Sequence, residues 1–214
     1  MKSIFALLFA LTAVSCQSKE KKLSAEKNKE IEIMDEQKGL EVATVAGGCF
    51  WCTEAVFLEL KGVKKVVSGY TGGTLKNPTY KEICTGTTGH AEAIAITFDP
   101  KLISYDDILE VFFATHDPTT LNRQGADVGT QYRSEIFYNS EAQKNAAENF
   151  IKLLNDQKIY GKNVVTAISK AGIFYPAEDY HQDYYNQNKS QPYCMAVINP
   201  KLEKLRKNYP SKLK

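Results

Sequence analysis

Stretches with the two-residue period of β-strands alternate along this chain with stretches that have the helical period. This alternation constrains the fold, because strands separated by helices bury their apolar faces against one shared sheet. The expected strands are residues 41–46, 63–70, 90–98, 132–138 and 163–169, and the expected helices are residues 49–60, 80–84, 104–116, 140–154 and 178–188. The sequence therefore predicts an α/β (α+β) domain in which a mixed sheet packs against helices.

The clearest of these strands is residues 90–98. Its even positions share one face and are bulky except for one carboxylate; they are His90, Glu92, Ile94, Ile96 and Phe98. Glu92 is therefore expected on the bulkier apolar face of the strand. Loss of water at such a place favours the protonated form of a carboxyl group.

The chain divides into three parts. Its 214 residues, 43% of them hydrophobic, can bury one sizeable core, which we assign to a single domain at residues 41–214. A positive charge at Lys2 precedes an apolar run at 4–14 that is too short to span a bilayer, which indicates an export signal peptide at residues 1–16. Residues 17–40 are rich in Lys and Glu and lack apolar periodicity, so we expect a flexible tether.

The signal segment ends in Ala-Val-Ser-Cys, which resembles the lipobox of bacterial lipoproteins, where the cysteine receives a lipid. Cys16 would then be an anchor. A typical lipobox has Leu where Ala13 stands, and a plain secretory signal with a chance cysteine is the alternative. We expect an exported protein, lipid-anchored at a bacterial membrane in the periplasm or cell envelope.

Charge argues against a nucleic-acid partner. The formal net charge is +2, and no basic stripe stands out after the signal segment. Four of the five cysteines lie in the predicted domain; they are Cys49, Cys52, Cys84 and Cys194. A domain of this size does not need disulfides for stability, so this cysteine usage indicates chemistry.

Cys49 follows a strand and a Gly-Gly turn and opens a helix. Unpaired backbone N–H groups and the positive end of the helix dipole favour a thiolate at such a position. The two small residues before it allow a substrate to approach the backbone. Cys49 is therefore a candidate nucleophile, with a buried structural cysteine as the alternative.

Cys52 lies three residues further, where helical spacing puts its Cα about 5 Å from that of Cys49, within disulfide range. Such a pair is a redox couple, half of a zinc site or a coincidence. A second Cys-x-x-Cys is absent, and the three histidines lack zinc-finger spacing. We therefore expect no metal.

Several blocks occur in the order shown by peptide methionine sulfoxide reductases of type A, the MsrA family. They are residues 47–52 (Gly-Gly-Cys-Phe-Trp-Cys), 69–73, 77–80, 88–93, 116–118 and 129–134. The resemblance runs from about Val42 to Cys194 and implies a two-layer sandwich around a ferredoxin-like core. It implies an oxidoreductase that reduces methionine S-sulfoxide, free or in proteins, and so repairs proteins damaged by oxidative stress.

The resemblance also implies roles for single residues. Cys49 is the nucleophile and Glu92 the acid, while Tyr80, Asp127 and Tyr132 bind and polarise the sulfoxide oxygen. Phe50 and Trp51 form an apolar cradle for the sulfoxide methyl group, with core packing as the alternative. No chemical step requires His181, which we interpret as structural. No metal or organic cofactor is implied, and a monomer is expected.

Oxygen transfer leaves Cys49 as a sulfenic acid, which a second thiol can convert to a redox-active disulfide. Cys52 is the first choice because its spacing already suits a disulfide; Cys194 is the alternative, directly or as a relay from Cys52. A thioredoxin-like dithiol would then reduce the enzyme. Cys84, on a short helix, is expected to be a small buried hydrophobe.

Two other functions remain open at this point. One is a thiol:disulfide oxidoreductase of the thioredoxin class, which export and the Cys-x-x-Cys pair suggest. In that class, however, neither Glu92 nor the Phe-Trp dipeptide between the two cysteines has a role. The other is a surface lipoprotein that binds peptides without catalysis, for which Cys49 would have a high pKa.

Overall fold

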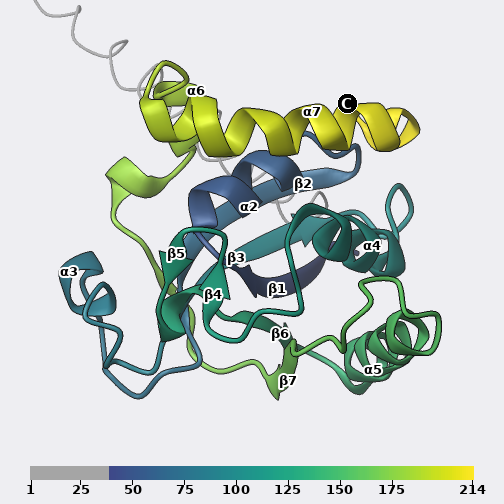
Figure 1. Cartoon of the computed structure of the whole chain (residues 1–214), viewed down its shortest axis with the longest axis horizontal. Helices are drawn as coiled ribbons and strands as arrows, with labels where there is room; N and C mark the ends of the chain where they lie inside the picture. Colours follow the sequence, from purple (N-terminus) through teal and green to yellow (C-terminus); the bar gives the residue numbers. More distant parts are fainter. Residues whose placement is uncertain (1–38) are drawn as a thin grey trace, which may run out of the picture. The chain divides into compact units, whose positions relative to one another are not determined.

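Six strands form the sheet on which the rest of the domain is built (Figure 1). The computed structural model of the protein describes residues 39–214, so the predicted signal segment, Cys16 and residues 17–38 of the predicted tether lie outside the described residues. The sheet strands are β1 (Glu41–Gly47), β2 (Val63–Thr71), β3 (Ala91–Phe98), β6 (Ser134–Tyr138), β7 (Ala167–Lys170) and β8 (Tyr175–Pro176). Their order in the sheet is β7-β6-β1-β3-β2-β8.

The centre of this sheet has the ferredoxin-like arrangement that we predicted. Strands β6, β1, β3 and β2 lie side by side and pair antiparallel, and along the chain they are interrupted by α2 (Phe50–Leu58) and α4 (Tyr105–Thr115). Strand β7 pairs parallel with β6, so the sheet is mixed. In this register Tyr70 of β2 lies opposite Glu92 of β3.

The remaining helices are α3 (Tyr80–Ile83), α5 (Glu141–Asp156), α6 (Tyr184–Gln187) and α7 (Asn199–Asn208). Two helices begin at serine caps. Ser104 forms a capping box with Asp107 at the start of α4, and the Ser140 side chain accepts a hydrogen bond from the Gln143 backbone N–H at the start of α5.

The two faces of the sheet are covered unequally. One face packs against the helices in the main core, whose fully buried members include Ile94, Ile96, Phe57, Phe112 and Leu202. The other face carries only the small cluster of Ala46, Ala91, Ala93 and Phe137. This is the expected two-layer construction, with one helical layer and one sheet.

Several predicted boundaries are wrong. The predicted strand at 163–169 pairs only from Ala167, because the Val164 and Val165 N–H groups donate to Asn155 and Pro118 instead. The predicted helix at 178–188 is broken at Asp183, whose φ of 48° is left-handed; a 3₁₀ turn (Asp179–His181) precedes the break. Residues between the expected elements at 104–116 and 132–138 form a small hairpin of β4 (Arg123–Gln124) and β5 (Asp127–Val128).

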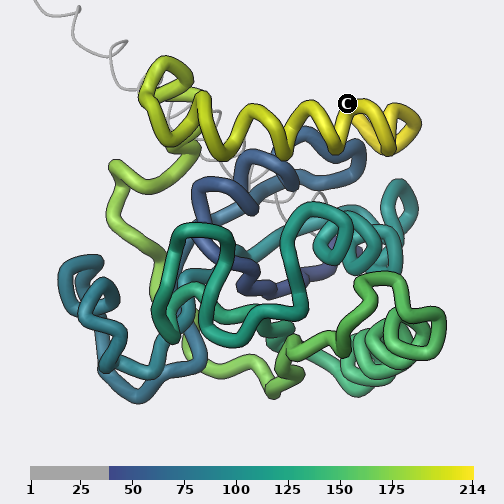
Figure 2. Tube along the Cα trace, in the orientation of Figure 1, coloured from purple at the N-terminus to yellow at the C-terminus, as the bar shows by residue number. Residues whose placement is uncertain are grey.

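The end of the chain was not expected to form a regular element, yet it forms a π-helix (Cys194–Ile198) followed by α7. Figure 2 shows the chain after β7 crossing to the other edge of the sheet, where β8 pairs with β2, and continuing to α6 and α7. Helix α7 packs on α2. The last residues reach the end of α2, where Leu60 pairs with Leu213 and the Lys214 N–H donates to the Glu59 carbonyl. None of the helices in residues 39–214 is long and apolar enough to cross a membrane.

Candidate active site

Cys49 lies at the N-cap of α2, directly after strand β1 and a tight turn. Gly48 in that turn has a φ of 92°, and a Cβ there would come within 2.6 Å of the Gln124 side chain on β4. Only glycine therefore fits between Cys49 and the β4–β5 hairpin. The turn therefore places the β4–β5 hairpin, which carries Asp127, next to the N-terminal end of α2.

Glu92 is held at the same helix end. Its Oε2 accepts a hydrogen bond from the Phe50 backbone N–H at 3.1 Å, one of the amides that a helix start leaves unpaired. The side chain is buried, and burial raises the pKa of Glu92 to about 8 although the Phe50 hydrogen bond opposes the rise. Its place on the apolar strand face predicted this protonated state at neutral pH.

Tyr80, Tyr132 and Asp127 come from three separate segments. Tyr80 opens α3, Tyr132 ends a 3₁₀ turn (Thr130–Tyr132), and Asp127 begins β5. Burial raises the pKa of both phenols, and the nearby charge of Glu92 raises them further. The two half-buried hydroxyls therefore stay protonated and can donate hydrogen bonds near Glu92.

Trp51 is half-buried and held from two sides. Its indole N–H donates to His181 Nδ1 at 3.0 Å, and its ring stacks on Tyr184 with centroids 3.7 Å apart. Phe50 is only 1% exposed and packs on Tyr70 and His181. Of the two residues of the predicted cradle, only Trp51 is partly exposed to a substrate, whereas Phe50 is buried and packs beside it.

The residues that hold this aromatic group belong to a segment that the sequence did not single out. We call residues 177–193 the C-terminal segment. Glu178 accepts hydrogen bonds from the Tyr70 hydroxyl and the Tyr80 backbone N–H, each at 2.9 Å. His181, interpreted as structural, is 1% exposed and contacts the rings of Phe50, Trp51 and Tyr80. The Asp-Tyr-His-Gln run at residues 179–182 identifies this segment in the sequence, but it does not predict which residues the segment contacts.

Buried Glu54 fastens the C-terminal segment to α2. Its carboxylate accepts hydrogen bonds from the backbone N–H groups of Asp183, at 3.0 Å, and Tyr184, at 3.4 Å. Burial raises the pKa of Glu54 to about 7, against the effect of these two bonds. The helix that carries Cys49 therefore also fixes the segment that holds Trp51.

Cys52 lies one helical turn from Cys49, and the two thiols are hydrogen-bond partners. Cys52 Sγ also lies 3.6 Å from the Tyr193 hydroxyl, which donates to Asp127 Oδ2 at 3.0 Å. Cys49, Cys52 and Cys194 are all buried and free, and Cys194 is 0% exposed at the start of the π-helix. Tyr193 was not among the predicted residues, because nothing in the sequence indicates that it reaches Cys52.

The two thiols share one ionisation. Burial raises the pKa of the Cys49 thiol, and its hydrogen bond to Cys52 raises it further. That hydrogen bond lowers the pKa of Cys52 to about 7 despite burial. Burial of Cys49 therefore opposes the thiolate that the helix start was expected to favour. The first proton is lost from the pair as a whole and not from one sulfur alone.

Cys84 is exposed, so the prediction of a buried hydrophobe is wrong. It caps α3, a helix of a single turn that buries only Ile83. No three His, Cys, Asp or Glu side chains come together as metal ligands among residues 39–214.

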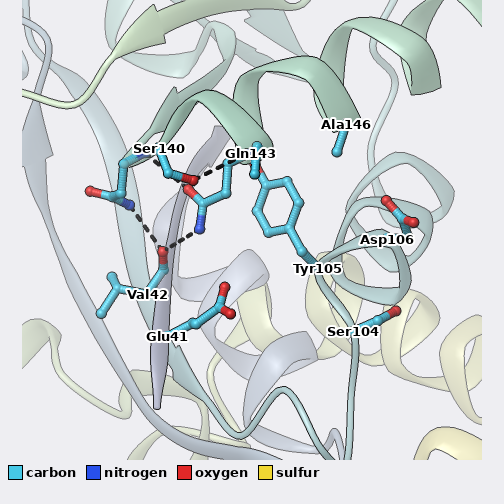
Figure 3. Close-up of a pocket in the computed structure, with 10 residues that line it drawn as sticks. Glu41, Val42, Ser104, Tyr105, Asp106, Ser140, Gln143 and Ala146 are labelled. Carbon is cyan, nitrogen blue, oxygen red and sulfur yellow. Dashed lines mark hydrogen bonds between the residues drawn. The ribbon is translucent and has the colours of Figure 1, made fainter. Parts of the chain in front are cut away.

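A hollow of about 680 Å³ lies elsewhere, between the N-terminal ends of α4 and α5 (Figure 3). Gln143 and Asn139 donate to the Val42 carbonyl in its wall. It is lined by Glu41, Val42, Ser104, Tyr105, Asp106, Asn139, Ser140, Ala142, Gln143 and Ala146. None of the predicted catalytic residues lines it, so we assign the chemistry to the thiol site.

Comparisons with known proteins agree with the geometry. Residues 41–213 match the family model described as peptide methionine sulfoxide reductase. Peptide methionine sulfoxide reductase MsrA of Deinococcus radiodurans is 59% identical over 174 residues, which are 81% of this chain and 84% of the relative. Mxr1 of Saccharomyces cerevisiae in reduced form has a TM-score of 0.69 and 34% identity, covering 73% of this chain and 90% of that one.

The same yeast protein in complex with Trx2 has a TM-score of 0.50 and 25% identity, and the match covers 68% of this chain and 85% of that chain.

Proposed function

Because the chain belongs to the peptide methionine sulfoxide reductase family, we propose that it reduces the S epimer of methionine sulfoxide, free or in oxidised proteins, with Cys49 as the nucleophile. The observation that carries the assignment is the pairing of Cys49, at the start of α2, with Glu92, which the first amide of that helix holds in place. A thiol and a protonated carboxyl group at one helix end are what sulfoxide reduction requires.

The first step begins with proton donation to the sulfoxide oxygen. Glu92 is protonated at neutral pH and supplies this proton, with the Tyr80 and Tyr132 hydroxyls and Asp127 around the oxygen. The methyl group of the sulfoxide lies against Trp51. Protonation makes the sulfoxide sulfur electrophilic enough for attack by a thiolate.

The shared ionisation of the thiols supplies the nucleophile. When the proton of Cys49 moves along the hydrogen bond to Cys52, the charge moves to Cys49, which attacks. The oxygen passes to Cys49, methionine leaves, and Cys49 becomes a sulfenic acid while Cys52 is a neutral thiol. The raised pKa of Cys49, caused first by burial and then by the neighbouring Cys52, describes the resting pair and does not mark an inert cysteine.

In the second step Cys52 attacks the sulfenic sulfur, and water leaves as the Cys49–Cys52 disulfide forms. A thioredoxin-like dithiol then reduces this disulfide. The complex of the structurally similar yeast protein with Trx2 supports such a donor. Cys194 stays the alternative second thiol. We expect the chain to act as a monomer.

The protein acts outside the cytoplasm as a lipoprotein, after removal of the signal peptide and lipid attachment at Cys16. The sequence of residues 1–16 supports this. Mass spectrometry of the mature N-terminus tests it, with Cys16→Ala as the control that should lose membrane attachment. Recovery of wild-type protein in the soluble fraction would contradict the anchor.

The central assignment is tested by mixing the protein, without reductant, with each epimer of methionine sulfoxide and measuring methionine. Wild type should release methionine from the S epimer alone, Cys49→Ser should release none, and Cys52→Ser should release about one equivalent. Release by Cys49→Ser at the wild-type rate would reject Cys49 as the nucleophile.

A further inference from the structure

The hydroxyl of Tyr193 lies between a thiol and a carboxylate that both serve the proposed function. It is 3.6 Å from Cys52 Sγ and donates its hydrogen bond to Asp127 Oδ2 at 3.0 Å. A phenol has one proton. Since that proton points to Asp127, the Tyr193 oxygen faces Cys52 as an acceptor. A neutral Cys52 thiol therefore donates to the Tyr193 oxygen, and the Tyr193 hydroxyl donates to the Asp127 carboxylate.

We propose that Tyr193 and Asp127 form a proton relay for the disulfide-forming step, carrying the Cys52 proton to the oxygen that leaves Cys49. This proposal rests on the proposed function and adds a catalytic residue to it. Residues outside the relay place the Tyr193 ring: it packs edge-on against Trp51 at 5.9 Å and is joined to the buried start of the π-helix.

The relay balances the second step. The Cys49–Cys52 S–S bond forms and the S–O bond of the sulfenic acid breaks. The Cys52 proton passes to the Tyr193 oxygen as the Tyr193 proton passes to Asp127, and the departing hydroxyl takes the proton from Asp127 and leaves as water. Net, one sulfenic acid and one thiol give one disulfide and one water, with no outside oxidant or reductant.

The surroundings favour a relay over a free tyrosinate. Burial raises the pKa of Tyr193, and the charges of Cys49 and Cys52 raise it further. Tyr193 therefore accepts the proton of Cys52 while it donates its own proton to Asp127. The first step makes the relay necessary, because it leaves Cys52 as a thiol that must lose its proton before it can attack.

The test uses the full-length protein and Tyr193→Phe, which removes only the hydroxyl. After mixing with methionine S-sulfoxide, methionine, sulfenic acid trapped with dimedone, and disulfide are measured over time. The variant should release methionine within about threefold of the wild-type rate. Its disulfide should form on the order of 100-fold more slowly, the size of a general acid–base contribution, and sulfenic acid should accumulate.

A pH series separates relay from packing. The titratable or charged groups near Cys52 are Cys49, Glu92, Asp127, Tyr193, Cys194 and Lys201. In Tyr193→Phe, disulfide formation should speed up steeply as the pH rises above 7, because hydroxide replaces the relay as the base. A lost packing contact would slow the step equally at every pH.

The matched control is Tyr185→Phe, which removes a hydroxyl that donates to Asn199 Oδ1 at 2.8 Å in the same part of the chain. It should leave both steps unchanged. Disulfide formation by Tyr193→Phe at the wild-type rate overturns the relay, and so does equal slowing of both steps at all pH values. A disulfide in Cys52→Ser also overturns it. Absence of methionine release by wild type rejects the proposed function, and the relay with it.

Discussion

The two sides of the site are built by different means. On one side, Cys49 and Glu92 are placed by adjacent strands of the sheet and by one backbone hydrogen bond. On the other side, Trp51 is held by the C-terminal segment, which reaches α2 and β2 mainly through side chains such as Glu54 and Gln182. The sheet side is thus fixed by register, and the C-terminal side by a few buried polar contacts that single substitutions can remove.

The largest effect is expected on the sheet side, with Glu92→Gln. Methionine release in a single turnover should fall on the order of 100-fold, because an amide cannot protonate the sulfoxide oxygen. In wild type the rate should fall as the pH rises through about 8, where the acid form of Glu92 is lost. Quenched single-turnover assays from pH 6 to 9.5 measure the rate of methionine release by the variant and the pH profile of the wild type. A variant with the wild-type rate and pH profile would remove Glu92 from the chemistry.

On the C-terminal side, His181→Phe should have a smaller effect. It keeps a ring against Phe50 and Tyr80 but removes the acceptor for the Trp51 indole N–H. Losing a hydrogen bond of about 1 kcal/mol should reduce kcat/KM roughly fivefold, mainly by raising KM, since in the proposed mechanism Trp51 contacts the methyl group of the substrate and not the transferred oxygen. Steady-state kinetics test this. A drop in kcat at constant KM would mean that His181 acts on the chemical step.

Glu54→Gln should change stability more than activity. The pKa of Glu54 is raised to about 7 in the folded protein, so its folded form binds a proton more tightly than the unfolded form. Wild-type stability contributed by Glu54 is therefore full at low pH and declines as the pH rises from about 4.5 to about 7. The variant lacks this decline.

Urea unfolding at pH 5 and pH 7.5 measures the difference. At pH 5 the variant should be less stable by about 1 kcal/mol, because its amide cannot accept from both backbone N–H groups. At pH 7.5 this deficit should shrink or reverse. A deficit that grows with pH would show that the ionised carboxylate stabilises the fold.

The smallest effect is expected for Cys84→Ser. Cys84 is exposed and lies at the end of the short helix α3. Thioredoxin-driven turnover should stay within about twofold of wild type, in contrast to Cys52→Ser, which should stop after one equivalent. Loss of multiple turnover in Cys84→Ser would add a third thiol to the cycle.

The same contrast explains what could be predicted from the sequence. Alternation in residues 90–98 predicted both β3 and the buried face of Glu92, and the Gly-Gly turn predicted the helix start at Cys49. These signals are local and periodic. The C-terminal segment has neither property: Asp183 is left-handed, α6 is a single turn, and a π-helix follows. Contacts such as Tyr193 with Cys52 join residues 141 apart in sequence. The resting charge on the thiol pair depends on burial, which local spacing does not determine.

The pairing of Leu213 with Leu60 ties α7 to the end of the helix that carries the two thiols. Leu202 and Leu205 of α7 are fully buried in the same core as Cys49 and Cys52. Separation of α7 from α2 would therefore also expose the thiols, so the rate at which a small alkylating reagent reaches them measures how firmly α7 is attached.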